Sequence, residues 1–290
     1  MDAVKDMLMA VPHILPQPLS PLFQKGGSFE WINEDVGLTC FFIFIMFLVD
    51  VLIVKPFLKP KSRYFALHIV ANTLSCIFSW PDVKRALLDD PLHAFSGPSC
   101  SMFANSAVAS IHLYHIIAFP LRGEDIFHHL TFVVVLCGLA IPFKQTGGAA
   151  NNLGCFFLSG LPGGLDYVSL VLEKQGAITR TAQKKFCAFI NVWLRGPSMS
   201  VYLFIGLQAL WRGSFTTPMW TIIVVVFLHF TNGQYYARQA VESLAVYLER
   251  EKNGLSEPSS PASPAVDDGS SKKQSSGKQP SRVGSPKKTK

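Results

Sequence analysis

The chain has 290 residues, of which 49% are hydrophobic and 16% are charged, and its mean hydropathy is +0.29. A soluble domain of this length needs a more highly charged surface, so the composition excludes an ordinary soluble domain and favours a membrane protein. The formal net charge is +7, but the segment 252–290 alone carries eight basic and three acidic residues. Most of the positive charge therefore belongs to the C-terminal tail, which argues against a nucleic-acid-binding face.

Residues 1–35 do not have the pattern of a secretory signal peptide. Asp2 and Asp6 make the start acidic, and four prolines interrupt any apolar run before residue 22. We therefore expect residues 1–35 to be an N-terminal segment that precedes the first membrane span.

Residues 36–250 contain seven stretches that approach the ~20 mostly apolar residues a helix needs to cross the hydrocarbon core. They cover 36–54, 64–80, 101–119, 126–143, 150–172, 187–211 and 219–236. The second, third and sixth stretches carry polar residues, and such spans are stable in lipid when those groups face protein or a cavity. We therefore expect an all-α fold, a multi-pass transmembrane helix bundle of about seven spans. Apolar residues recur at helical spacing as far as Leu248, so the last helix should continue beyond its span.

Lysine and arginine are concentrated in alternate connections between these stretches. Four lie in the connection 55–63 and four in 173–186, whereas the connections on the opposite side carry one or two each. Because cytosolic loops are enriched in these residues, we expect the N-terminus to be lumenal or outside and the C-terminus to be cytosolic. Residues 1–35 would then be lumenal.

The tail 251–290 is rich in Ser, Pro, Gly and Lys and has almost nothing to bury, so it is predicted to be disordered and cytosolic. Its positive charge favours binding to anionic lipid, with plain solubility as the alternative. The last four residues, KKTK (287–290), resemble the dilysine retrieval signal of endoplasmic-reticulum membrane proteins, which coat proteins read. We therefore expect an integral membrane protein of the endoplasmic reticulum or another endomembrane.

Polar side chains from several spans fall at one depth. Counting from each cytosolic end at about 1.5 Å per residue places them roughly 3–12 Å below the cytosolic surface. Polar groups that converge in a membrane are usually functional or paired, so we expect a pocket open to the cytosol above an apolar floor for acyl chains. The predicted lining residues are His112, His115, Asp125, Arg195, His229 and Asn232.

Simpler structural roles stay open for some of these residues. Asp50 is expected to pair with Lys55 near the surface. Asp166 and Arg195 have matched depths and opposite charges, so a buried structural ion pair is an alternative to catalysis. His68, near an interface, is expected to be structural.

Two adjacent histidines, His128 and His129, stand in the first turn of the fourth span. Adjacent helical residues point about 100° apart, so at least one of the two rings must face the bundle. We therefore expect this pair to belong to a site, with a purely structural role as the alternative.

The stretch "EDIFHHLTF", followed about 35 residues later by "GGLDYVSLVLEK", resembles the TLC domain, the fold of ceramide synthases and related lipid-handling membrane proteins. The resemblance covers about residues 30–250. It implies that His128 and His129 are general bases or acyl acceptors and that Asp166 orients or charges a ring. Ceramide synthases carry a His-Asp pair where this chain has Ser159 and Gly160. The chain is therefore more similar to the TLC proteins with proposed roles in lipid sensing, transport and membrane composition.

Three functions stay open. The first is an acyl-CoA-dependent N- or O-acyltransferase, with catalytic residues His128, His129 and Asp166, acyl-CoA as co-substrate, no metal and no permanently bound cofactor. The second is a non-catalytic lipid sensor, transporter or regulator of membrane composition that uses the same pocket. The third, less expected, is a haem or metal membrane protein. Membrane lipids are the expected partners, nucleic acid is not, and homo-oligomerisation stays open.

Overall fold

The computed structural model describes residues 30–99, 101–121, 123, 126, 129–141, 143 and 146–255, with only the backbone for residues 30–34, 131, 132 and 139. This part of the chain is all-α, as predicted, apart from an isolated bridge between Phe95 and Phe215. The predicted segment 1–35 is therefore described only from residue 30, and the predicted tail 251–290 only to residue 255.

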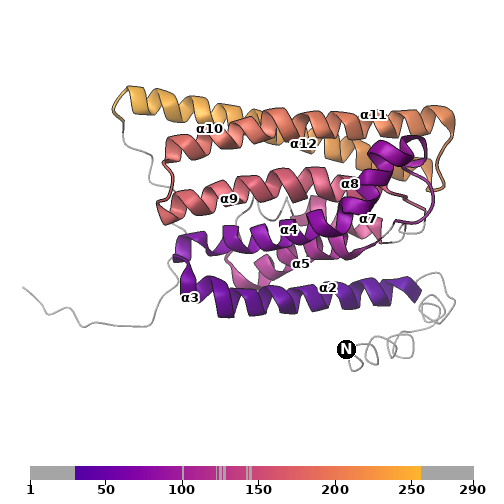
Figure 1. Cartoon of the computed structure of the whole chain (residues 1–290), viewed down its shortest axis with the longest axis horizontal. Coiled ribbons are helices and arrows are strands. Elements are labelled where there is room, and N and C mark those ends of the chain that lie inside the picture. Colours follow the sequence, from indigo (N-terminus) through magenta and orange to yellow (C-terminus); the bar gives the residue numbers. More distant parts are fainter. Residues whose placement is uncertain are drawn as a thin grey trace, which may run out of the picture. The chain divides into compact units, whose positions relative to one another are not determined.

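The described residues form seven helical segments (Figure 1). The first three are α2 (Glu30–Val49) with η2 (Asp50–Val54) and α3 (Lys55–Phe57), then α4 (Arg63–Lys84) with η4 (Arg85–Asp89), then α5 (Phe103–Ala118). The other four are η6 (Leu130–Cys137) with α7 (Gly138–Ala140), then α8 (Ala150–Cys155) with η7 (Phe156–Gly160) and α9 (Leu161–Gln175), then α10 (Arg180–Ile190) with η8 (Asn191–Arg195) and α11 (Gly196–Arg212), then α12 (Met219–Lys252). Five of the segments contain the apolar stretch predicted there, α5 covers most of the stretch 101–119, and η6 with α7 lies within the stretch 126–143. The helix α12 continues to Lys252 as expected.

Prolines explain most of the wide, π-helical turns that interrupt these segments. The turns η2, η4, η7 and η8 each end with an amide that donates to the carbonyl five residues back, as Lys55 does to Asp50 and Gly196 to Asn191. In all four the next residue is proline, at positions 56, 91, 162 and 197. Proline has no amide hydrogen and its ring clashes with the carbonyl four residues earlier, so the helix widens just before it. Asp50 and Arg195 both lie in such turns.

The helix α4 lies at the centre of the arrangement. It packs against α5 and α9, and α5 in turn packs against α2, while α9 packs against α10 (Figure 1). One apolar core, which includes Met46, Leu67 and Ile111, joins α2, α4 and α5. A second core, which includes Met199 and Ile222, joins α11 and α12 to α8. Between these two cores, α4 and α9 lie where polar side chains from α5 on one side and from η8 on the other can approach them.

Hydrogen bonds between connections define the two ends of the bundle. At one end Lys59 donates to the carbonyl oxygen of Gln175 (2.7 Å), and the Gln175 amide donates to Ser62 Oγ (3.1 Å). At the opposite end Ser96 Oγ donates to the carbonyl oxygen of Ser214 (3.0 Å) and Thr216 Oγ1 to that of Thr146 (2.9 Å). We call the first the basic end, after Lys55, Lys59, Lys61, Arg63, Lys174, Arg180 and Lys184. The alternation of ends is the one that the charge pattern predicts.

Within the described residues, two helical segments are long and apolar enough to cross a membrane, Asp35–Phe57 and Ala150–Gln175. That criterion rests on length and composition alone. The prediction that all seven segments are membrane spans therefore stays a prediction.

Candidate functional site

The carboxylate of Asp50 is fully buried at the start of η2 and is held by Arg63. The Arg63 guanidinium donates to both carboxylate oxygens, at 2.7 and 2.5 Å, and the Tyr114 hydroxyl donates to Oδ2 at 2.7 Å. The expected contact with Lys55 exists at 3.7 Å, but it is the weakest of the three and the carboxylate does not reach the surface. The ion pair therefore fixes α2, α4 and α5 against one another at the basic end.

Four imidazole rings lie together beside this ion pair. His68 comes from α4, His112 and His115 from α5, and His129 from the residue before η6. The His129 ring centroid is 5.4 Å from that of His112 and 5.1 Å from that of His115, and His68 lies 6.1 Å from His112. All four are buried. We call these four residues the histidine cluster.

Backbone carbonyls set the proton position on two of the rings. His68 Nδ1 lies 2.9 Å from the carbonyl oxygen of Tyr64, and His112 Nδ1 lies 2.7 Å from that of Val108. A carbonyl oxygen only accepts, so each Nδ1 carries the hydrogen, and the neutral ring then has its lone pair on Nε2. In that neutral form, both rings can accept a proton at Nε2.

Aromatic side chains surround the histidine cluster. The Tyr64 ring lies 4.2 Å from His68 and 4.5 Å from His115, and the Tyr167 ring of α9 lies 4.5 Å from His68. Phe119 closes the side next to His115, at 5.5 Å. The sequence analysis did not single out Tyr64 and Tyr167. Tyr64 stands one helical turn before His68 and so shares its face, a signal that was available.

A second polar cluster lies between α9, η8 and α12. Asn191 Nδ2 lies 3.4 Å from Asp166 Oδ2, and the side-chain oxygen Oδ1 of Asn191 accepts from Arg195. Cys187 Sγ lies 3.5 Å from the same Asp166 oxygen, and the Arg195 guanidinium stands 5.4 Å from the centre of the Tyr236 ring. We call these residues the arginine cluster: Asp166, Cys187, Asn191, Arg195 and Tyr236.

Asp166 and Arg195 do not form the direct ion pair that the sequence left open. Within the described part of the chain, no carboxylate oxygen lies within 4 Å of the Arg195 guanidinium, and Asn191 bridges the two groups instead. The polar contacts of Asp166 are with α10 and η8, and it is the next residue, Tyr167, that touches His68. These contacts do not support the role expected of Asp166 beside an imidazole, which stays a prediction.

His229 lies apart from the histidine cluster. Its Nδ1 lies 2.6 Å from the carbonyl oxygen of Val225, and its ring stacks at 4.8 Å on Tyr202 of α11. A Cβ on Gly154 would stand 2.5 Å from His229 Nε2, so the ring packs directly on the α8 backbone. The structure therefore gives His229 a packing role between α8, α11 and α12. Asn232 is half-buried nearly one turn further along α12.

Several predicted residues lie outside the part that the structure describes. His128 and Asp125 are among them. Their predicted roles stay predictions. Of the predicted site residues, the structure brings together His112, His115 and His129, and it adds His68, which the sequence analysis expected to be structural.

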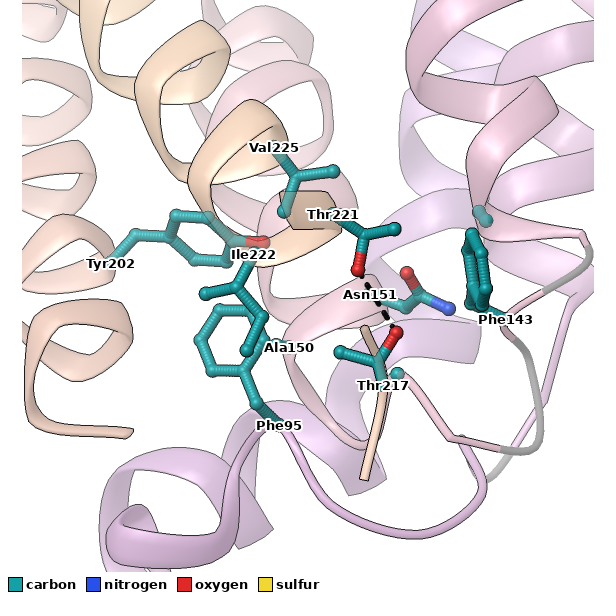
Figure 2. Close-up of a pocket in the computed structure, with 11 residues that line it drawn as sticks. Phe95, Phe143, Ala150, Asn151, Tyr202, Thr217, Thr221, Ile222 and Val225 are labelled. Carbon is teal, nitrogen blue, oxygen red and sulfur yellow. Dashed lines mark hydrogen bonds between the residues drawn. The ribbon is translucent and has the colours of Figure 1, made fainter. Parts of the chain in front are cut away.

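A small cavity of about 20 Å³ lies toward the opposite end, between α8, α11 and α12 (Figure 2). Figure 2 shows Asn151, Thr217 and Thr221 on one side of it and Tyr202 on the other, with the two threonine hydroxyls 3.0 Å apart. A cavity of this size and polarity suits one water molecule. It is too small for a lipid or a cofactor.

The opposite end also has a buried network of polar side chains that the sequence did not predict. Asp82 and Asn152 are both fully buried. The Asn152 amide donates to Asp82 Oδ2 at 2.6 Å and to the carbonyl oxygen of Ser101 at 2.7 Å, and Arg85 pairs with Asp82 at 2.9 Å. This network fixes α4, α8 and the start of α5.

Among the described residues, no group of three or more His, Cys, Asp or Glu side chains is arranged to hold a metal ion. Comparison of the sequence with models of protein families found no match. Comparisons with curated proteins and with solved structures also found none.

Proposed function

We propose that this chain is a seven-span membrane protein of TLC type that binds lipids and transfers acyl groups at the histidine cluster. The observation that carries the proposal is the convergence of four buried imidazoles from three helical segments at the basic end. The resemblance of "EDIFHHLTF" to the TLC domain supports the same site.

Exposed apolar side chains support the membrane location. Large hydrophobic residues are exposed on nearly every helix, and they include aromatic rings such as Trp193 at 70%, Phe227 at 63% and Phe204 at 60%. A water-soluble monomer rarely exposes contiguous apolar surface on this scale, whereas lipid-facing helices require it. Charged side chains gather instead at the two ends, with most lysines and arginines at the basic end. That end would face the cytosol, in a membrane of the endoplasmic reticulum or another endomembrane.

The chemistry follows from the lone pair on an imidazole nitrogen. An amine or hydroxyl acceptor attacks the carbonyl carbon of an acyl-CoA thioester, so that an N–C or O–C bond forms and the C–S bond breaks. A neutral imidazole takes the proton of the attacking group and returns it to the departing CoA thiolate. We assign this role to His129, because its ring lies closer to both His112 and His115 than the ring of His68 does. Acyl-CoA would approach from the cytosol, where basic side chains meet its phosphates.

The test uses the purified full-length chain with radiolabelled acyl-CoA and a panel of amine and hydroxyl lipid acceptors. The proposal predicts time-dependent transfer of label to at least one acceptor, with release of one free thiol for each acyl group transferred. If no acceptor is labelled while lipid copurifies with the protein, the catalytic proposal fails and non-catalytic lipid binding replaces it.

A further inference from the structure

The arginine cluster carries an inference of its own, because two of its charged groups have opposite unmet hydrogen-bonding needs. Arg195 is 7% exposed, and its Nε has no acceptor within the described structure. Oδ1 of Asp166 is likewise buried and has no donor there. A buried guanidinium or carboxylate is costly unless it is paired and hydrogen-bonded.

Asn191 lies between the two charges and satisfies one atom of each. Its side-chain oxygen Oδ1 accepts from Arg195, and its side-chain nitrogen Nδ2 lies 3.4 Å from Asp166 Oδ2. A direct ion pair would use both charges, but no such pair forms within 4 Å. The bridge therefore holds the guanidinium and the carboxylate apart while leaving one hydrogen-bonding atom of each unmatched.

The shape around Arg195 is set by a glycine. A Cβ on Gly163 would stand 3.0 Å from Asn72 Nδ2 and 3.6 Å from Arg195 NH2, so the bare α9 backbone lets both donors come close. Asn72 Nδ2 of α4 and Arg195 NH2 of η8 thus both pack close to the α9 backbone at Gly163. Asp166, nearly one turn further along α9, is half-buried and places a negative charge on the same helix as Gly163.

We propose that the arginine cluster binds a phosphoethanolamine head group, with the phosphate on Arg195 and Asn72 and the ammonium on Asp166. A lone anion would satisfy Arg195 but would lie beside the Asp166 carboxylate, and a lone cation would face the guanidinium. A group that carries a phosphate and a primary ammonium matches both charges at once. A quaternary ammonium fits less well, since it has no hydrogen to donate to Asp166 Oδ1.

The inference rests on the membrane location in the proposed function but not on acyl transfer. Binding is therefore measured without acyl-CoA, separately from turnover. Absence of turnover in the wild type, together with the expected head-group preference, would count against the proposed catalysis alone.

The experiment measures which phospholipids remain bound to the purified full-length chain after exchange into mixed micelles of phosphatidylethanolamine, phosphatidylcholine and phosphatidylglycerol. The wild type should retain phosphatidylethanolamine about tenfold over either competitor, the effect expected of one charge-assisted hydrogen bond. Asp166→Asn should abolish the preference over phosphatidylglycerol, and Arg195→Gln should lower retention of all three. Arg195→Lys keeps the positive charge, so comparing it with Arg195→Gln separates loss of the charge from a folding defect. Arg238→Gln is the control, because Arg238 is exposed and paired with Glu242.

Free phosphoethanolamine, added as a competitor, distinguishes a lipid occupant from a soluble one. Displacement of the lipid only at a large excess supports a lipid head group, and displacement at low concentration supports the same site with a soluble occupant. Equal retention of the three lipids by the wild type would overturn the inference. Unchanged retention in both Asp166→Asn and Arg195→Gln, with both variants folded, would overturn it as well.

Discussion

The Asp50 carboxylate and the Arg63 guanidinium form a two-point ion pair, with hydrogen bonds of 2.7 and 2.5 Å, between the end of the first helical segment and the start of the second. Tyr114 completes the pair from α5, and its neighbour in sequence is His115 of the histidine cluster. The ion pair thus braces the helix end from which two of the four imidazoles extend.

Asp50→Asn should therefore destabilise the protein. The substitution leaves Arg63 without its counter-charge while the site stays buried, and removing one partner of such a pair costs about 2–4 kcal/mol when the other is partly exposed. Thermal unfolding in detergent should show a clear fall in Tm. The matched control is Asp89→Asn, whose ion pair with Lys84 is exposed and should contribute less than about 1 kcal/mol. Equal Tm values for the two variants would contradict the bracing role.

Gly154→Ala should also destabilise the fold, although alanine normally stabilises a helix relative to glycine. The new Cβ would stand 2.5 Å from His229 Nε2, a ring already fixed by Val225 and Tyr202. Overpacking of this kind costs about 1–3 kcal/mol. Gly164→Ala serves as the control, since its Cβ would meet Asn72 Cβ at an ordinary 3.5 Å. A Tm for Gly154→Ala that equals or exceeds that of Gly164→Ala would show that His229 does not pack as described.

Pro197→Ala tests whether the wide turn η8 positions Arg195. Pro197 is exposed, so its loss removes little packing, but alanine supplies an amide that lets the turn narrow to an ordinary α-helix. Arg195 and Asn191 would then rotate relative to Asp166. We expect the preference for phosphatidylethanolamine to fall severalfold with little change in Tm. Pro81→Ala, a proline inside α4, is the comparison that should leave lipid preference unchanged. If Pro197→Ala keeps the wild-type preference for phosphatidylethanolamine, the wide turn η8 does not position Arg195 for lipid binding.

The orientation can be tested with engineered cysteines in sealed microsomes. Lys61 and Asp90 are exposed and lie at the basic and the opposite end respectively. A membrane-impermeant maleimide should label Lys61→Cys in intact vesicles, above the wild-type background. Asp90→Cys should react only after the membrane is made permeable. Labelling of both sites in intact vesicles would contradict the proposed spanning arrangement, and the reverse pattern would invert it.

Run length and charge were enough to predict the helical segments and their alternation, because these properties are local. Each apolar stretch became one helical segment, and the Lys59–Gln175 bond joins connections that the charge pattern had placed together. Proline positions also carried information about backbone geometry, since in four of the wide turns the residue whose amide closes the turn is followed directly by a proline.

The candidate site was predicted less completely from the depth of each residue below the cytosolic surface, because depth does not say which side of a helix a residue faces. His112, His115 and His129 share both a depth and a direction, whereas His229 shares the depth but faces α8 and α11. Asp166 and Tyr167 are adjacent, yet one contacts α10 and the other contacts His68. Directions of this kind depend on how the helices pack, which one sequence does not reveal.

The central claim is that the histidine cluster performs acyl transfer, and the most direct test compares His129→Gln with His229→Gln. Both residues are buried histidines, but only His129 adjoins other imidazoles in the described structure. We predict that His129→Gln lowers acyl transfer from acyl-CoA at least about a hundredfold, as expected for loss of a general base, while His229→Gln retains most of the activity. Equal activities in the two folded variants, or loss confined to His229→Gln, would contradict the account.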